Sequence, residues 1–122
     1  MRNKLLKNFK IYVAGHNGMV GRALVSYLQK EGVKNIIFAN RKKLNLLNAK
    51  DLEKFIRYKK PDIVINCAGK VGGILANSSY PVEFMNENIL IQLNLVNLSY
   101  KYKIKHFVNL GSSCIYPKNS KQ

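Results

Sequence analysis

The sequence predicts an α/β fold, a Rossmann-like parallel sheet with helices on both faces. Three observations predict it. Apolar runs of strand length alternate with amphipathic helical patterns along the chain, as in sheets built by right-handed crossovers. A glycine-rich turn joins the first apolar run to the first helical pattern. The run from Asp62 to Cys67 is mainly apolar, which is typical of a parallel strand covered on both faces.

Each element follows from its own pattern. The first strand is expected over Lys10–Ala14, and the first helix runs from Gly18 to Lys30, with a C-terminal cap at Gly32. Further strands are expected at Asn35–Ala39, Leu44–Leu46, Asp62–Cys67 and His106–Leu110, and further helices at Ala49–Lys59 and from Pro81 to about Tyr102, with a loop over 69–80. The expected strand order is 3-2-1-4-5, in a truncated sheet.

The last helical pattern carries two apolar stripes. One contains Met85, Ile89, Gln92, Val96 and Tyr100, and the other contains Phe84, Ile91, Leu95, Leu98 and Tyr102. One stripe should cover the sheet, and the second must be buried by a further helix or a second subunit. We expect a homodimer when the protein is complete, and a further helix stays open as the other cover for this stripe.

Composition limits the classes of protein. The 122 residues suffice for one domain, and no apolar run approaches the ~18 residues of a membrane span. The net charge is +15, but the Lys and Arg residues are scattered and form no basic helix. We therefore expect neither a nucleic acid nor a membrane as partner, with a basic nucleic-acid binder kept as an alternative. The isolated Cys67 and Cys114 indicate reduced thiols in a cytoplasmic setting and no metal site.

The glycine-rich turn, Gly-His-Asn-Gly-Met-Val-Gly, spans residues 15–21. Gly15 permits a tight turn off the strand, Gly18 leaves backbone N–H groups open to a pyrophosphate, and Gly21 allows close packing of the helix. The start of the helix also favours anions, because its first N–H groups are free. We expect dinucleotide binding here, the alternative being a plain glycine-rich turn. The expected cofactor contacts are Gly15, His16, Asn17, Gly18, Met19, Val20 and Gly21.

Two later loops should meet the glycine turn. Ligands of such sheets bind beyond the carboxyl ends of the strands, where the strand order reverses. The expected cofactor contacts in these loops are Ala68, Gly69, Lys70, Leu110, Gly111, Ser112 and Ser113.

The cofactor type follows from the end of the second strand. NAD-binding sites usually carry an Asp or Glu there, which holds the ribose hydroxyls. This chain instead has Asn40 and Arg41, followed by two lysines. Arg41 can bind a 2′-phosphate, so we expect NADP; the alternative is that Arg41 only faces solvent.

Several segments together resemble the GDP-L-fucose synthase family of extended short-chain dehydrogenase/reductases. The most specific are Lys70-Val71-Gly72-Gly73-Ile74 and Gly111-Ser112-Ser113-Cys114-Ile115-Tyr116-Pro117-Lys118. The other matching segments are the glycine turn, Leu44-Asn45-Leu46-Leu47, Ala76-Asn77 and Tyr80-Pro81. The resemblance covers essentially the whole chain. It implies an enzyme that uses NADPH to epimerise C3 and C5 and to reduce C4 of a GDP-linked keto-deoxy sugar. It also implies that Asn45 and Leu46 contact the cofactor.

The same resemblance assigns two catalytic residues. The serine matching Ser112 hydrogen-bonds the keto oxygen at C4, and the cysteine matching Cys114 exchanges protons beside that carbonyl. Without the resemblance, Cys114 would be a small buried residue and Ser112 a turn former. Two further alternatives stay open: another sugar-nucleotide epimerase, dehydratase or reductase of the same fold, and a non-enzymatic NADP-binding domain.

One family motif is missing. The superfamily needs Tyr-x-x-x-Lys, in which the Tyr donates a proton to the developing alkoxide and the Lys lowers the pKa of that Tyr. None of the seven tyrosines has a Lys four residues later. Residues 1–122 are therefore expected to be the N-terminal NAD(P)-binding part of an enzyme, without the catalytic Tyr/Lys segment and the substrate lobe.

Overall fold

The computed structural model describes residues 6–112, 117 and 119. Its centre is a sheet of four parallel strands in the order β2-β1-β3-β4. The strands are β1 (Ile11–Ala14), β2 (Ile36–Ile37), β3 (Ile63–Asn66) and β4 (His106–Asn109). In the register, Ile11 of β1 lies opposite Ile36 on one side and Ile63 on the other. The predicted parallel α/β architecture is confirmed.

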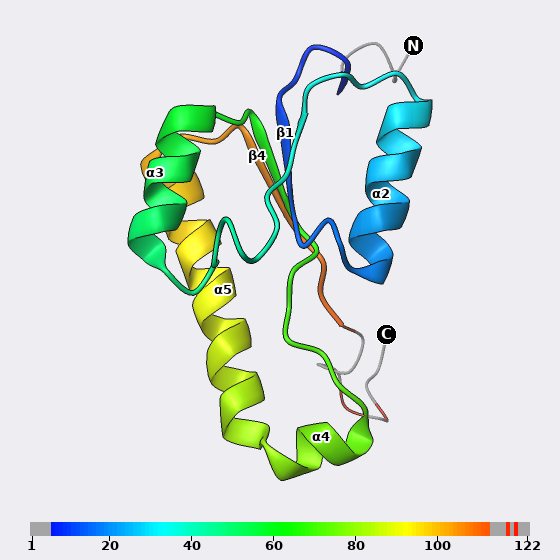
Figure 1. The fold of residues 1–122 in the computed structure, drawn as a ribbon, viewed down its shortest axis with the longest axis vertical. Coiled ribbons are helices and arrows are strands. Elements are labelled where there is room, and N and C mark those ends of the chain that lie inside the picture. Colours follow the sequence, from blue (N-terminus) through cyan, green and yellow to red (C-terminus); the bar gives the residue numbers. More distant parts are fainter. Residues whose placement is uncertain (1–5, 113–116, 118, 120–122) are drawn as a thin grey trace.

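Helices cover both faces of this sheet (Figure 1). They are α2 (Met19–Lys30), α3 (Ala49–Lys59), α4 (Ile74–Ser79) and α5 (Pro81–Lys101). α2 lies on one face, where Leu28 packs with Val13. α3 and α5 lie on the opposite face, where Leu52 and Leu95 pack with Tyr12. Neighbouring residues of β1 thus enter different cores, because successive side chains of a strand point to opposite faces.

Local signals set the helix ends. The side-chain oxygen of Asn48 caps α3 by accepting hydrogen bonds from the N–H groups of Lys50 and Asp51. Pro81 opens α5 at a position where its missing N–H would have no intrahelical partner. α3 begins and ends where the sequence predicts, and α5 ends one residue before the predicted Tyr102.

The expected strand at Leu44–Leu46, the third in the predicted order, does not form, whereas the other four predicted strands keep their expected order as β2-β1-β3-β4. The backbone there is engaged in turns instead: the N–H of Leu44 donates to the carbonyl oxygen of Asn40 (2.9 Å), and the N–H of Leu47 donates to the side chain of Asn45 (3.1 Å). β2 has only two residues and offers a short edge for a further strand. Leu44 instead buries its side chain in the core below α3 and α5.

The stretch 69–80, expected as a loop, contains the short helix α4. The side-chain amide of Asn77 donates to the carbonyl oxygens of Gly72 (3.0 Å) and Gly73 (3.2 Å). The N–H of Tyr80 donates to the carbonyl oxygen of Ala76 (3.0 Å), so α4 runs directly into the start of α5. No residue of α4 is buried. The apolar periodicity that predicts a packed helix is therefore missing from this stretch.

α5 is much longer than the strands it covers. Its 21 residues extend over about 31 Å, whereas a four-residue strand extends over about 13 Å. The N-terminal half of α5, together with α4, therefore projects beyond the carboxyl ends of the strands (Figure 1). This overhang contributes a wall to the cleft described below.

The two stripes of α5 have different surroundings. Leu95 and Leu98 are buried against the sheet, as predicted for one stripe. On the other stripe, Met85, Ile89 and Val96 are exposed. Among the described residues, the search for a helix with the length and apolarity of a membrane span finds none.

Candidate functional site

A cleft of about 230 Å³ lies at the carboxyl ends of β1, β2 and β3. Its walls come from the glycine turn after β1, the segment after β2, the segment after β3 and the overhanging part of α5. The predicted contact residues that line it are Gly15, His16, Asn17, Gly18, Arg41, Asn45, Leu46, Ala68, Gly69 and Lys70. The topology thus brings together residues from four segments that are distant in the sequence.

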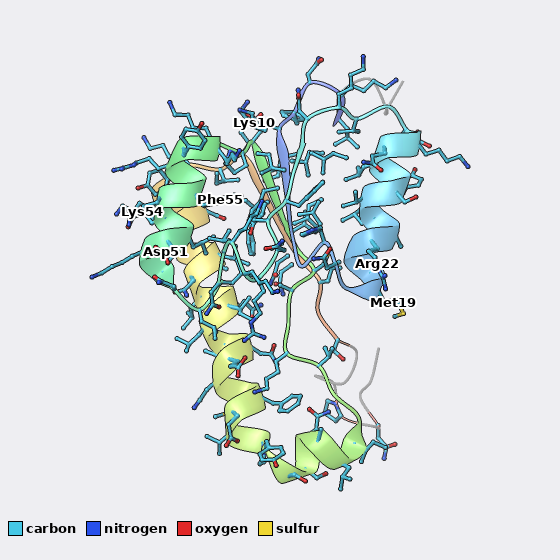
Figure 2. All side chains as sticks on the ribbon, in the orientation of Figure 1. Lys10, Met19, Arg22, Asp51, Lys54 and Phe55 are labelled. Atoms are coloured by element: carbon cyan, nitrogen blue, oxygen red, sulfur yellow. The ribbon has the colours of Figure 1, made fainter. Side chains whose placement is uncertain are left out.

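Other predicted site residues lie outside this lining. Met19 and Val20 are exposed in the first turn of α2, and Figure 2 shows Met19 at the N-terminal end of that helix. Leu110, Gly111 and Ser112 follow β4 at the same edge of the sheet but do not line the cleft. Ser113 and Cys114 lie outside the described residues.

The glycine turn is packed too tightly for side chains. Gly15 has a φ of +77°, and a Cβ atom there would lie 2.6 Å from the backbone of Ala68. A Cβ atom on Gly21 would overlap the carbonyl oxygen of Gly15. The two glycines therefore let the turn press against both the segment after β3 and the first turns of α2. This close packing explains why glycine is needed at both positions.

The start of α2 is open to an anion. Gly18 occupies the N-cap position without a side-chain cap, and the first turn contains no acidic residue. The N–H of Gly18 donates to the carbonyl oxygen of Gly15 (3.0 Å), and the next helical hydrogen bond starts at Arg22. The first N–H groups of a helix have no intrahelical partner and, with the helix dipole, favour negative charge.

His16 fixes the glycine turn against the end of β2. Its ring stacks on that of Phe38, with ring centroids 4.6 Å apart and an angle of 24° between the planes. Phe38 follows β2 directly and is itself half-exposed. The stacking links two walls of the cleft and supports a structural role for His16.

Asparagine side chains of α5 hold two further walls. Asn88 accepts from the N–H of Lys70 (2.7 Å) and donates to the carbonyl oxygen of the same residue (3.0 Å). Asn94 donates to the carbonyl oxygen of Leu46 (2.8 Å). These bonds satisfy backbone groups that no strand or helix satisfies, and they fix the spacing of the loops from α5.

The floor of the cleft is apolar and uncharged. Tyr12, Leu44 and Ile91 contribute to it, and Tyr12 also packs against Phe55 of α3, with ring centroids 5.0 Å apart. Burial raises the pKa of Tyr12 and that of the Cys67 thiol, so both stay protonated at neutral pH. A floor of this kind suits the flat, apolar face of an aromatic ring.

The rim of the cleft carries three charges. The Lys70 ammonium lies 2.6 Å from a carboxylate oxygen of Glu87, and the Arg41 guanidinium lies 3.6 Å from the other. The hydrogen bond from Lys70 lowers the pKa of Glu87, so Glu87 is ionised at neutral pH. Two cations and one anion leave the rim positive. No group of three His, Cys, Asp or Glu side chains within the described part of the chain could hold a metal ion.

Several residues that shape the cleft carry no distinct sequence signal. Phe38 and Tyr12 belong to ordinary strand patterns, and Asn88 and Asn94 belong to a composition rich in lysine and asparagine. Glu87 is one of only six acidic residues, and this scarcity in a chain of net charge +15 is the signal that could have singled it out.

Comparison with known proteins places this geometry in a family. The model of the NAD-dependent epimerase/dehydratase family matches residues 11–122, which include all four strands and the whole cleft. The chain belongs to the NAD-dependent epimerase/dehydratase family.

Within this family, the similar proteins include GDP-L-fucose synthases. GDP-L-fucose synthase 1 of Arabidopsis thaliana is 45% identical over 116 residues, which are 95% of this chain and 36% of the relative. GDP-L-fucose synthase of Sinorhizobium fredii is 43% identical over 118 residues, which are 97% of this chain and 37% of the relative. The chain therefore spans little more than a third of the length of these relatives.

A solved structure is similar in both sequence and fold. MlghC, a GDP-mannoheptose C4 reductase from Campylobacter jejuni with NADP bound, superposes with a TM-score of 0.88 at 39% identity. The match covers 94% of this chain and 34% of that protein. The fold described here thus corresponds to about a third of that longer protein.

Proposed function

We propose that residues 1–122 form the NADP-binding part of an enzyme that epimerises C3 and C5 and reduces C4 of a GDP-linked 4-keto-6-deoxy-mannose. One observation carries the proposal. The open N-terminus of α2 and the cation Arg41 border the same cleft, whose β2 end carries no acid. A phosphate-rich dinucleotide with a 2′-phosphate fits this arrangement of charges.

The residues present fit each part of that dinucleotide. Gly15 and Gly18 would leave the pyrophosphate access to the N–H groups at the start of α2. Arg41 would hold the 2′-phosphate, which an acid in its place would repel. The apolar floor near Leu46 would hold the adenine ring. Met19, Val20 and Gly21 would contribute backbone N–H groups, and Ala68, Gly69 and Lys70 would complete the wall after β3.

The segment after β4 would bring the reacting groups to the cofactor. Leu110, Gly111, Ser112 and Ser113 follow the strand next to β3, at the edge where the cleft opens. The bound cofactor would supply the hydride that reduces C4. Ser112 would donate a hydrogen bond to the C4 oxygen, and Cys114 would exchange the acidic protons at C3 and C5. Both roles rest on the sequence resemblance.

The substrate class is supported by the relatives. The names of the GDP-L-fucose synthases and of the GDP-mannoheptose C4 reductase both include a GDP-linked sugar. A homodimer is supported by α5, whose outer stripe leaves Met85, Ile89 and Val96 exposed. A second copy of the same helix would cover this stripe.

The test measures cofactor selectivity in the full-length gene product. We expect NADPH to bind more tightly than NADH, and Arg41→Ala to reduce that preference by about 1.5–3 kcal/mol, the scale of hydrogen bonds to charged groups. Arg57→Ala, an equal change on the exposed side of α3, should leave the preference intact. Equal loss of affinity for both cofactors would contradict a phosphate contact at Arg41.

The reaction is tested on the same protein with GDP-linked and dTDP-linked 4-keto sugars. We expect turnover of the GDP-linked sugar. Cys114→Ser should slow the exchange of C3 and C5 protons into heavy water, because it replaces a thiol by a far weaker acid. Unchanged exchange would leave Cys114 without the proposed role. Tight NADPH binding with no turnover of either sugar would favour the alternative, a non-enzymatic NADP-binding domain.

A further inference from the structure

Glu87 bridges two cations that come from different walls of the cleft. Lys70 belongs to the segment after β3, Arg41 to the segment after β2, and Glu87 to the second turn of α5. One carboxylate oxygen of Glu87 meets Lys70 at 2.6 Å, and the other meets Arg41 at 3.6 Å. The Glu87 carboxylate therefore connects the two walls of the cleft that carry Lys70 and Arg41.

The two halves of this bridge differ in strength. Lys70 and Glu87 are both largely shielded, with side-chain exposures of 31% and 25%, and they make a short charge-assisted hydrogen bond. Lys70 is further held by Asn88 at its backbone and by the ring of Phe84, 5.1 Å from its ammonium group. Arg41 is 77% exposed, and its ion pair is long, so it is weak and readily exchanged. Glu87 thus stays on Lys70, while Arg41 can leave.

We propose that Glu87 is a built-in competitor of the cofactor's 2′-phosphate for Arg41, and that it thereby limits the preference for NADPH over NADH. The proposal rests on the proposed NADP function. A phosphate monoester carries about −1.5 to −2 charge and three acceptor oxygens, so it can displace one carboxylate oxygen from Arg41. NADPH binding then breaks the Arg41–Glu87 pair and brings a second anion near Glu87. NADH has a hydroxyl at this position and requires neither change.

Removal of the Glu87 charge should therefore favour NADPH selectively. In the full-length gene product, Glu87→Gln should lower the calorimetric Kd for NADPH about two- to five-fold, the scale of an exposed ion pair. The Kd for NADH should change less than about two-fold. Glutamine keeps the shape and can still accept a hydrogen bond from Lys70, which preserves the loop; Glu87→Ala should give the same change of ratio.

Two controls separate this role from a general charge effect. Glu83→Gln removes the same charge one turn earlier on α5, at an exposed position, and should leave the ratio of the two Kd values unchanged. In an Arg41→Ala background, Glu87→Gln should no longer change that ratio, because the group for which the two anions compete is gone. Thermal unfolding of each variant shows whether the fold is retained.

The outcomes are distinct. Equal changes of both Kd values in Glu87→Gln, no change, or weaker NADPH binding would each overturn the competitor role. Persistence of the effect without Arg41 would overturn it as well, since Glu87 would then act on another group. If the wild type preferred NADPH but the Glu87 variants did not raise that preference, the proposed function would stand and this inference would be wrong. A wild type that bound neither dinucleotide would overturn both.

Discussion

At the scale of single residues, Asn88 connects α5 to the segment after β3 through two hydrogen bonds to one peptide unit. Asn88→Ala removes both bonds and should lower the free energy of unfolding by about 1–3 kcal/mol. It should also weaken the binding of NADPH and of NADH to the same extent. The reason is that it releases the whole segment from 68 to 70 and removes no contact with a phosphate. Asn86→Ala, at an exposed position two residues earlier, is the matched control. A selective effect on NADPH would contradict this assignment. The measurements are thermal unfolding and calorimetric titration of both cofactors.

Asp62 makes the fold sensitive to acid. It accepts a hydrogen bond from the Lys105 ammonium (2.8 Å) and from the backbone N–H of Lys10 (2.9 Å), and these contacts hold its pKa below the ordinary value. The folded state therefore binds fewer protons than the unfolded state near pH 4, so stability falls as the pH drops through this range. Asp62→Asn should be less stable at pH 7 and should lose less stability between pH 7 and 3. Melting temperatures of both proteins across this range test it; parallel curves would contradict it. Asp51→Asn controls for the loss of one acid elsewhere.

The sequence predicted the glycine positions that shape the backbone of the site better than the hydrogen bonds and ion pairs between its side chains. The positions of Gly15 and Gly21 were predictable, because a tight turn and a close approach leave glycine as the residue that fits. The partners of Asn88 and Glu87 were not, because they lie 17 or more residues away in the sequence and depend on how far α5 overhangs the sheet. The binding of cofactor at these positions stays a prediction.

At the scale of elements, α3 shows what controls helix ends in this chain. Lys60 follows it in the left-handed conformation, with φ of +48°, which strains a residue with a side chain by roughly 1–2 kcal/mol. Lys60→Gly should relieve part of that strain and raise stability by about 0.5–1 kcal/mol, the greater freedom of glycine in the unfolded chain offsetting the rest. Lys54→Gly, inside the same helix on its outer side (Figure 2), should instead lower stability by about 1 kcal/mol. Thermal unfolding of both variants tests the contrast, and a loss of stability in both would contradict it.

Elements with strong periodicity were predictable, and those held by local polar bonds were not. α3 has Leu52 and Ile56 on one buried face, and its bounds match the prediction. The predicted strand at Leu44–Leu46 also has an apolar pattern, yet the N–H groups of Leu44 and of Leu47 just after it donate to Asn40 and Asn45 in turns, which sequence hydrophobicity does not report. α4 has no buried residue and therefore no periodic signal.

At the scale of the whole molecule, the two faces of the sheet are unequally covered. α3 and α5 cover one face, whereas α2 lies on the other (Figure 1), where its cluster includes residues of β1, β2 and β3 but none of β4. On that second face, Val108 of β4 and Leu110 just after it remain about half-exposed. The topology accounts for this, because crossovers that move in opposite directions along the sheet fall on opposite faces. A second exposed apolar surface, the outer stripe of α5, adds to the exposed area.

These surfaces predict that the 122-residue chain associates in solution. The charge of +15 opposes association, but it is unevenly placed: α5 contains one Lys and two Glu and so carries a charge of −1 (1 − 2). Two copies can therefore approach through α5 with little repulsion, and burial of Ile89 and Val96 favours contact. Sedimentation should show concentration-dependent oligomers. Ile89→Lys combined with Val96→Lys should shift them toward monomer, whereas Tyr58→Lys, on the exposed side of α3, should not. A monodisperse wild-type monomer with a sharp thermal transition and no binding of hydrophobic dyes would show that these surfaces are too small to drive association.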